Sequence, residues 1–372
     1  MNLFFCVSWD KIKERTWSGT CYSLYKALSR IYRFSEISLS HNSLFWKILR
    51  KLKLYNDFDI NYVIKNRRYV NKKIKNKKHS IVFQFTDIVY DTDSISTFVY
   101  QDMSVSYIKY LYYHNPLILK YSGYGNLSLQ VIEKRNKMEE EYFKNCSGIF
   151  TMGKWYKNFL IQHCNIDSQK VHHVGGGINL EKDKIDYKYK KRNKILFVGR
   201  DFTRKGGYLV YEAFLYIKKM GYDYELHIAG PSKNPIPNSQ EGYYFHGDCS
   251  KDELSELFNM CDIFCMPSYY EAYGLVFIEA LTYGLPCIGR NVYEMPFFIE
   301  NNVTGYLIDD DNIPVLATKI IDLFKNEQIF QNVKDRKNKY IKEYSWDTVA
   351  ERIQCVINEK LKTTNIDSDC SN

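Results

Sequence analysis

Residues 263–283 read IFCMPSYYEAYGLVFIEALTY, and the order of features in this stretch decides the fold. Four apolar residues at 263–266 have the composition of a short buried strand, and Pro267 ends that strand. A loop that contains Glu271 follows, and Gly274 precedes an apolar segment that continues as a helix to Tyr283. A strand, a polar loop and a helix in this order form the repeating unit of a parallel sheet covered by helices.

The same alternation extends through the second half of the chain. It predicts strands at 194–199, 224–229, 242–246, 263–266, 286–289 and 305–308, and helices at 207–220, 251–261, 274–283 and 313–325. The first half repeats the pattern less sharply. There we expect strands at 2–8, 36–39, 81–85, 98–100, 148–151 and 170–175, and helices at 21–30, 44–54 and 154–163.

These segments predict an α/β chain of two doubly wound, Rossmann-like domains with parallel sheets that face each other across a cleft. We place the first domain at 1–180 and the second at 181–345, where the charged segment 181–194 has the polarity of an exposed linker. The polar tail at 363–372 is expected to be disordered. Ligands of such folds bind at the carboxyl ends of the strands, so we expect the site in the cleft.

Composition and charge restrict the class of partner. The 372 residues are 45% hydrophobic, which is enough for each of two domains to bury a core. The formal charge of +9 favours anionic partners such as nucleic acid, acidic lipid or phosphorylated ligands. Residues 65–78 contain eight Lys and Arg residues and no acid, which indicates either a solvated surface or an anionic partner. The basic, amphipathic helix at 44–54 either packs on a sheet or contacts anionic lipid.

Cysteine usage and the first residues bear on location. The ten cysteines include no CxxC pair and no Cys/His spacing of a metal site, so we expect no disulfide framework and a reducing, cytoplasmic environment. The first residues, MNLFFCVSWDKIKER, have a short apolar run without a basic leader, which favours a first strand over a signal peptide. No segment approaches the roughly 18 apolar residues that a membrane span requires.

The loop GRDFTRKGG at 199–207 is the first candidate for chemistry. It follows a predicted strand and precedes a helix, so Arg200 and Lys205 are expected at a strand's carboxyl end, beside glycines that allow a ligand to approach the backbone. A diphosphate fits such a site, because Arg binds it as a fork and Lys as a point charge. A solvated basic loop is the alternative for this segment taken alone.

Two glutamates are the second candidate. Glu271 precedes a helix, and Glu279 lies inside that helix among apolar neighbours, so we expect Glu279 to be largely buried. A buried carboxylate requires hydrogen-bond donors, and a pair of sugar hydroxyls can supply them. Gly274 begins the helix, whose free N–H groups can bind a phosphate. A glutamate that caps a neighbouring loop is the structural alternative.

Together these residues resemble the retaining GT-B glycosyltransferases of family 4, also called glycosyl transferases group 1. The resemblance rests on the second-half segments FVGRDFTRKGG, ELHIAGP, PSYYEAYGLVFIEALTYGLPCI and YSWDTVAERI, in which Glu271 and Glu279 match the family's Glu-x7-Glu motif. The first half matches more weakly, in TMGKWYKNFL and VHHVGGGIN. The resemblance implies transfer of a sugar, with retention of configuration and without metal, from a nucleotide-sugar donor to a glycan or lipid-linked acceptor.

The resemblance also implies roles for the residues around the donor diphosphate. Arg200 and Lys205 would neutralise the diphosphate, and the backbone N–H groups of Gly274 and Leu275 would bind it. As the anomeric C–O bond breaks, the departing nucleoside diphosphate gains negative charge, which these groups would stabilise. The acceptor hydroxyl would attack from the face that the leaving group departs, and the departing phosphate would take the proton.

The remaining donor contacts are implied in the same way. Glu279 would bind the ribose hydroxyls of the nucleotide, and Glu271 would hold the donor sugar. The loop that begins at Asp248 would lie near the base. Two further residues complete the predicted donor set: Gly199 and Tyr273.

In the first half the resemblance implies a site residue in the loop after the first strand. Gly19 would lie under the donor phosphates or the acceptor, although the family often has a Gly-Gly pair where this chain has Ser18-Gly19-Thr20. Asp102 follows a predicted strand where related enzymes carry a catalytic-centre His or Asp, and a helix cap is its structural alternative. The helix at 346–362 would cross back to the first domain.

Other classes of function were weighed against this prediction. A non-catalytic basic protein that binds nucleic acid or acidic membrane is favoured by the charge, but the acidic pair argues against it, so we predict no nucleic-acid partner and allow peripheral contact with anionic membrane. A GT-B nucleotide-sugar epimerase is the closer alternative. Asp91-Thr92-Asp93 has the DxD spacing of metal-dependent transferases, but it lies in a first-half loop and is interpreted as a turn.

Overall fold

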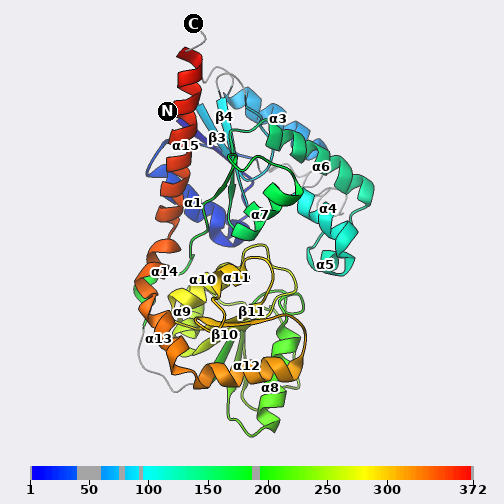
Figure 1. Cartoon of the computed structure of the whole chain (residues 1–372), viewed down its shortest axis with the longest axis vertical. Coiled ribbons are helices and arrows are strands. Elements are labelled where there is room, and N and C mark those ends of the chain that lie inside the picture. Colours follow the sequence, from blue (N-terminus) through cyan, green and yellow to red (C-terminus); the bar gives the residue numbers. More distant parts are fainter. Residues whose placement is uncertain (1, 40–59, 75–79, 92–94, 187–192, 370–372) are drawn as a thin grey trace. The chain divides into compact units, whose positions relative to one another are not determined.

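The computed structural model describes residues 2–39, 60–74, 80–91, 95–186 and 193–369. The chain divides into two compact units, of which unit 1 comprises Met1–Gly176 and Trp346–Asn372 and unit 2 comprises Gly177–Ser345. Each unit contains a six-stranded parallel sheet with helices packed around it (Figure 1). The predicted fold class of two doubly wound α/β domains is therefore confirmed. The predicted helix at 44–54 lies outside the described residues, as do Asp93 and residues 75–78.

The strands of unit 1 run in the order β2-β1-β3-β4-β5-β6. Their bounds are β1 Asn2–Val7, β2 Arg33–Ser38, β3 Ser80–Gln84, β4 Ile95–Gln101, β5 Gly148–Thr151 and β6 Val171–His173. The inner strands are buried on both faces, which explains why their sequences are almost continuously apolar. The strand order reverses between β1 and β3, so the carboxyl ends of these two strands form the topological switch point.

The α-helices of unit 1 include four that the apolar pattern did not predict, namely α3 Ile60–Ile74 and the three that lie between β4 and β5. The described helices are η1 Lys13–Gly19, α1 Thr20–Ser29, α3 Ile60–Ile74, α4 Val105–His114, α5 Pro116–Tyr121, α6 Leu129–Lys144, α7 Lys154–His163 and α15 Trp346–Asp369. The unpredicted helices α4, α5 and α6 begin after Ser104, Asn115 and Ser128, each of which accepts a hydrogen bond from a first-turn N–H. These capping residues were the signal that the periodicity analysis missed.

Helix α15 is the last helix of the described residues. It continues to Asp369, beyond the expected end at residue 362. Figure 1 shows α15 alongside α1, and an ion pair between Arg30 and Asp347 links the two helices. The first turns of α15 bury Val349, Ala350 and Ile353, so the C-terminal helix is part of the core of unit 1.

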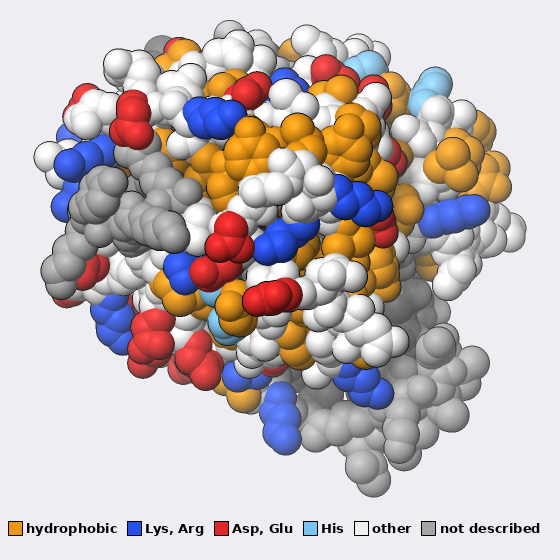
Figure 2. Space-filling model, turned by 90° about the horizontal axis from the view of Figure 1, so that it is seen from below, with side chains coloured by type: hydrophobic (Ala, Val, Ile, Leu, Met, Phe, Trp, Pro, Cys, Tyr) orange, Lys and Arg blue, Asp and Glu red, His pale blue; other side chains and the backbone are white. Residues whose placement is uncertain are grey.

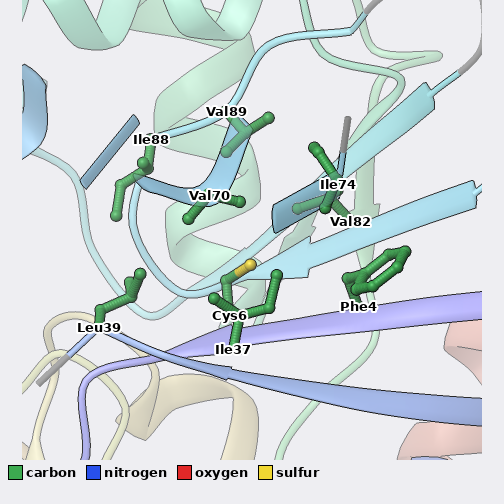
Figure 3. Packing of buried hydrophobic residues seen from close by; sticks show 9 residues of the cluster. All are labelled: Phe4, Cys6, Ile37, Leu39, Val70, Ile74, Val82, Ile88 and Val89. Atoms are coloured by element: carbon green, nitrogen blue, oxygen red, sulfur yellow. The ribbon is translucent and has the colours of Figure 1, made fainter. Parts of the chain in front are cut away.

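Helix α3 is attached to the sheet through one apolar face. Figure 3 shows Val70 and Ile74 packed in a cluster with side chains of β1, β2 and β3. The other members of the cluster are Phe4, Cys6, Ile37, Leu39, Val82, Ile88 and Val89. Because this face is buried, four basic residues of α3 are left on its outer side, namely Lys65, Arg68, Lys72 and Lys73.

The strands of unit 2 run in the order β12-β11-β10-β7-β8-β9. Their bounds are β7 Lys194–Val198, β8 Glu225–Ala229, β9 Tyr243–Gly247, β10 Ile263–Met266, β11 Cys287–Arg290 and β12 Gly305–Ile308. From β7 the chain first extends the sheet through β8 and β9, and then returns to the other side of β7 to form β10. The switch point of unit 2 therefore lies between the carboxyl ends of β7 and β10.

The helices of unit 2 cover this sheet (Figure 1). They are η2 Lys182–Lys184, α8 Gly207–Lys219, α9 Lys251–Met260, α10 Leu275–Thr282, α11 Met295–Phe298, α12 Ile313–Lys325, α13 Glu327–Asp335 and α14 Lys337–Glu343. The described part of the predicted linker belongs to this unit. Asn259 of α9 donates to the Lys184 carbonyl at 2.6 Å and accepts from the Asp186 N–H at 2.9 Å, so residues 181–186 pack on the domain.

The surface of the chain mixes apolar and charged side chains. Figure 2 shows one face on which hydrophobic side chains gather among basic and acidic ones. The large apolar side chains that stay exposed include Tyr208 and Tyr216 of α8 and Met220, which follows this helix. Among the described residues, no helix is long and apolar enough to cross a membrane.

Candidate active site

The switch point of unit 2 holds an ion pair between two predicted site residues. Lys205 lies in the loop after β7, and Glu271 lies in the loop after β10. Lys205 Nζ is 2.8 Å from Glu271 Oε2, and the two side chains are only 12% and 14% exposed. Because β7 and β10 are neighbours in the sheet, the strand order brings these residues together across 66 positions of sequence.

Two glycines allow the loops to approach this closely. A Cβ atom on Gly199 would lie 2.3 Å from Cδ of Lys205, so only glycine lets the lysine side chain pass over this position. A Cβ atom on Gly206 would lie 2.6 Å from the Pro267 carbonyl oxygen, and the φ of Gly206 is +77°. Gly199 therefore leaves room for the Lys205 side chain, and Gly206 allows its loop to pack against the loop after β10.

Glu279 is buried near the ion pair and has few partners. The residue is 7% exposed, and the Asn179 N–H donates to its Oε1 at 3.2 Å. Burial raises the pKa of Glu279 to about 7, against the opposing effects of the Asn179 N–H and the charges of Lys251 and Lys205. No other hydrogen bond to this carboxylate is found among the described residues. The carboxylate therefore retains capacity to accept hydrogen bonds from a ligand.

The N-terminus of α10 lies between the two glutamates in sequence. Gly274 adopts a φ of +93° and caps the helix, and Tyr273 beside it is buried. The left-handed conformation of Gly274 turns the chain from the loop into the helix that begins at Leu275. The Phe277 N–H donates to the Gly274 carbonyl at 2.9 Å. The earlier N–H groups of a first helical turn, here those of Leu275 and Val276, have no partner one turn back in the helix, so they are available to an anion.

Arg200 lies at the same edge of the sheet in a different setting. Its side chain is 72% exposed, and Nε is 3.7 Å from Oδ1 of Asp248, which follows β9. The guanidinium is therefore held loosely and is accessible to solvent. The structure thus places the predicted donor residues along the carboxyl edge of one sheet, with Lys205 in a tight pair and Arg200 in a loose one.

Comparison with known proteins identifies this unit. Residues 179–345 match the family described as glycosyl transferases group 1. Unit 2 thus matches the group 1 glycosyltransferases over nearly its whole length, and we call it the group 1 domain. The match covers Lys205, Glu271 and Glu279 together, so the residues at the switch point belong to the part of the chain that defines the family.

Two curated relatives align with parts of the chain. An uncharacterised 41.2 kDa protein in the cps region of Klebsiella pneumoniae is 31% identical over 144 residues, which are 38% of this chain and 38% of that protein. The capsular polysaccharide biosynthesis glycosyltransferase CapM of Staphylococcus aureus is 24% identical over 196 residues, which are 49% of this chain and 51% of CapM. The chain thus spans about half or less of the length of these relatives.

A solved structure resembles the whole chain. The crystal structure of a glycosyltransferase from Rickettsia africae ESF-5 superimposes with a TM-score of 0.67 at 17% identity, and the match covers 97% of this chain and 98% of that chain. At this identity the likeness concerns the fold. It shows that the group 1 domain and unit 1 together have the GT-B fold.

Unit 1 brings the two predicted first-half residues to one edge of its sheet. Gly19 has a φ of +91° and caps α1, while Asp102 directly follows β4. Burial and the charges of Asp10 and Asp102 raise the pKa of the Cys21 thiol in the first turn of α1, which places Asp102 near that turn. The cap of α4 is Ser104 and not Asp102.

A cavity of about 680 Å³ is a separate feature of unit 1. It lies between α4, α6 and α7 and is lined by aromatic side chains such as Tyr110 and Phe159 and by the buried amide of Asn136. Neither Gly19 nor Asp102 lines it.

Sequence reasoning missed two arginines beside the ion pair of the group 1 domain. Arg204 donates from Nη1 to the Tyr270 carbonyl at 2.6 Å, and Arg290 at the end of β11 is almost fully buried. Arg204 stands next to Lys205 in sequence, and two adjacent cations look equivalent until the fold separates them. Within the described residues there is no cluster of three His, Cys, Asp or Glu side chains placed to hold a metal ion.

Proposed function

We propose that this protein transfers a sugar from a nucleoside diphosphate sugar to a hydroxyl group of a glycan or lipid-linked acceptor, with retention of configuration. The observation that carries the proposal is the arrangement at the switch point of a group 1 domain. There Lys205, Glu271, Glu279 and the N-terminus of α10 lie on neighbouring elements of one sheet edge.

Each part of this arrangement suits one part of the donor. The buried carboxylate of Glu279 has unused acceptor capacity, which suits the two hydroxyls of a ribose. Lys205 and the exposed Arg200 suit a diphosphate, because Arg binds phosphate oxygens as a fork and Lys binds them as a point charge. Glu271 lies beside Lys205 and would hold the hydroxyls of the donor sugar.

The proposed reaction depends on stabilising the leaving group. The bond between the anomeric carbon and the phosphate oxygen breaks, and the acceptor oxygen forms the new bond on the same face of the sugar. The acceptor proton passes to the departing phosphate. Lys205, Arg200 and the first-turn N–H groups of α10 would stabilise the charge that grows on the nucleoside diphosphate, a role that requires no metal ion.

Similarity to proteins with capsule-related names favours a glycan acceptor. One relative is described by its position in a cps region, and another as a capsular polysaccharide biosynthesis glycosyltransferase. We place acceptor binding in unit 1, with Gly19 and Asp102 at its edge. The comparisons give no support to a non-catalytic nucleic-acid-binding protein.

Peripheral contact with anionic membrane is part of the proposal and is supported by α3. Its outer side exposes Lys65, Arg68, Lys72 and Lys73, with Tyr69 among them. A surface on which Lys and Arg side chains surround a tyrosine ring suits an anionic lipid surface. The nine described cysteines are all free thiols, which supports a cytoplasmic location.

A panel of nucleotide-sugars tests the donor proposal. The melting temperature of the full chain would be measured with UDP- and GDP-linked sugars, for the wild type and for Glu279→Ala. We expect at least one compound to raise the wild-type melting temperature, and Glu279→Ala to lose most of that rise. If no compound stabilises the wild type, the proposed function is wrong.

A further inference from the structure

Lys205 has two possible anionic partners at the switch point, namely the Glu271 carboxylate and the donor diphosphate. Lys205 Nζ is within hydrogen-bond distance of Glu271 Oε2, and its other close neighbour is Sδ of Met266 at 3.7 Å. If Lys205 binds the donor diphosphate, as the proposed function requires, Glu271 must share its cation with the phosphates. A carboxylate that is 14% exposed is costly to leave without a positive partner.

A second cation is already beside that carboxylate. Arg204 Nη1 lies 3.7 Å from Glu271 Oε2 and donates to the Tyr270 carbonyl at 2.6 Å. The Arg204 carbonyl accepts from the Tyr269 N–H at 2.9 Å, and Arg204 Nε lies 3.4 Å from Oδ2 of Asp201. Arg204 therefore joins the loop after β7 to the loop after β10 through both its backbone and its side chain.

The opposite side of the loop after β10 is held as well. Arg290 of β11 lies over the Tyr269 ring, 4.7 Å from its centre, and Nη2 is 3.5 Å from the Pro267 carbonyl oxygen. Asp311, which follows β12, pairs with Arg290 and accepts from the Tyr269 hydroxyl at 3.1 Å. Arg204 on one side and Arg290 with Asp311 on the other thus hold residues 267–271 in place. Of the two cations beside Glu271, Lys205 is then the one that can change its partner.

We propose that Arg204 is a positioning residue that holds Glu271 in place and compensates its charge while Lys205 turns to the donor diphosphate. The inference rests on the proposed function and adds a residue to it. Arg204 itself does not contact the donor in this account. When Arg204 is absent, Lys205 is the one cation paired with Glu271 in the described part of the chain, so a diphosphate must compete with the carboxylate for the lysine.

Nucleotide binding in a double-mutant cycle tests this proposal. UDP and GDP serve as probes, and their dissociation constants are measured by calorimetry for the wild type, Arg204→Met, Glu271→Gln and the double variant. We expect Arg204→Met to weaken binding about fivefold, and the double variant to bind within about twofold of Glu271→Gln, because the competing carboxylate is gone. Arg204→Gln keeps a hydrogen-bond donor at this position but carries no charge, and we expect the same loss from it.

Matched controls separate this role from a structural one. Lys219→Met removes an exposed cation from α8 of the same unit and should leave binding unchanged. A loss in Arg204→Met that Glu271→Gln fails to relieve would overturn the proposal, because disrupted packing or direct phosphate contact predicts no rescue. Unchanged binding in both Arg204 variants would also overturn it. If the wild type binds neither nucleotide, the proposed function fails and this inference fails with it.

Discussion

Each unit contains a buried glutamate whose pKa burial raises to about 7, and the two differ in their partners. In unit 1, Glu139 of α6 accepts from the N–H groups of Val105 and Ser106 at 3.1 and 3.0 Å and from the Ser106 hydroxyl at 3.1 Å. In unit 2, Glu279 accepts from the Asn179 N–H, and no second donor is found among the described residues.

The surroundings of Glu139 show that its role is internal. It completes the N-terminus of α4, and the cation of the buried Arg135–Asp87 pair lies one turn away on α6. Three donors use most of the acceptor capacity of its carboxylate. Glu279 has the same burial and a similar pKa but has acceptor capacity to spare. The count of hydrogen-bond donors, and not the pKa, distinguishes a ligand site from a structural carboxylate.

The largest effect expected from this comparison is on stability. Glu139→Ala should lower the free energy of unfolding by about 3 kcal/mol, because it leaves the buried N–H groups of Val105 and Ser106 without their acceptor and removes a negative partner of Arg135. Urea titration followed by circular dichroism measures this change. Glu141→Ala, an exposed glutamate on the same helix, is the control and should change stability by less than about 0.5 kcal/mol. Equal losses in both variants would mean that Glu139 is not a cap.

The matching substitution in unit 2 should separate binding from stability. Glu279→Gln should weaken UDP or GDP binding about tenfold, because a neutral amide accepts fewer hydrogen bonds from the ribose, and it should not lower the free energy of unfolding at pH 8. Calorimetry and urea titration supply the two measurements, with the exposed Glu256→Gln of α9 as control. A loss of stability as large as that of Glu139→Ala would remove the distinction between the two glutamates.

The smallest expected effect is a pH dependence of nucleotide binding. Because the pKa of Glu279 is raised from 4.5 to about 7, its carboxylate is mostly protonated at pH 6 and mostly ionised at pH 8. Wild-type affinity for the nucleotide should therefore rise about fivefold between these values, and that of Glu279→Gln should rise less. The raised pKa also stabilises the fold below pH 4.5, and this contribution is lost as the pH rises through 7. Parallel pH profiles in the two proteins would contradict the assignment.

Local sequence predicted unit 2 more fully than unit 1 for a physical reason. Strands β10 and β12 and helix α12 begin and end where the apolar pattern placed them. Their residues alternate cleanly between buried runs and polar turns. In unit 1 the long connection between β4 and β5 contains three helices with mixed polar surfaces, and their caps are a weaker signal than an apolar stripe.

The sequence by itself determined the βα alternation, the two glutamates eight positions apart and the burial of Glu279, because all of these depend on neighbours within one or two helical turns. Only the tertiary structure decided which partner each cation of the loop after β7 contacts. Arg200, Arg204 and Lys205 lie in one short loop, yet one faces Asp248, one holds the Tyr270 carbonyl and one pairs with Glu271. These partners come from other strands of the sheet, so strand order assigned roles that no local pattern contains.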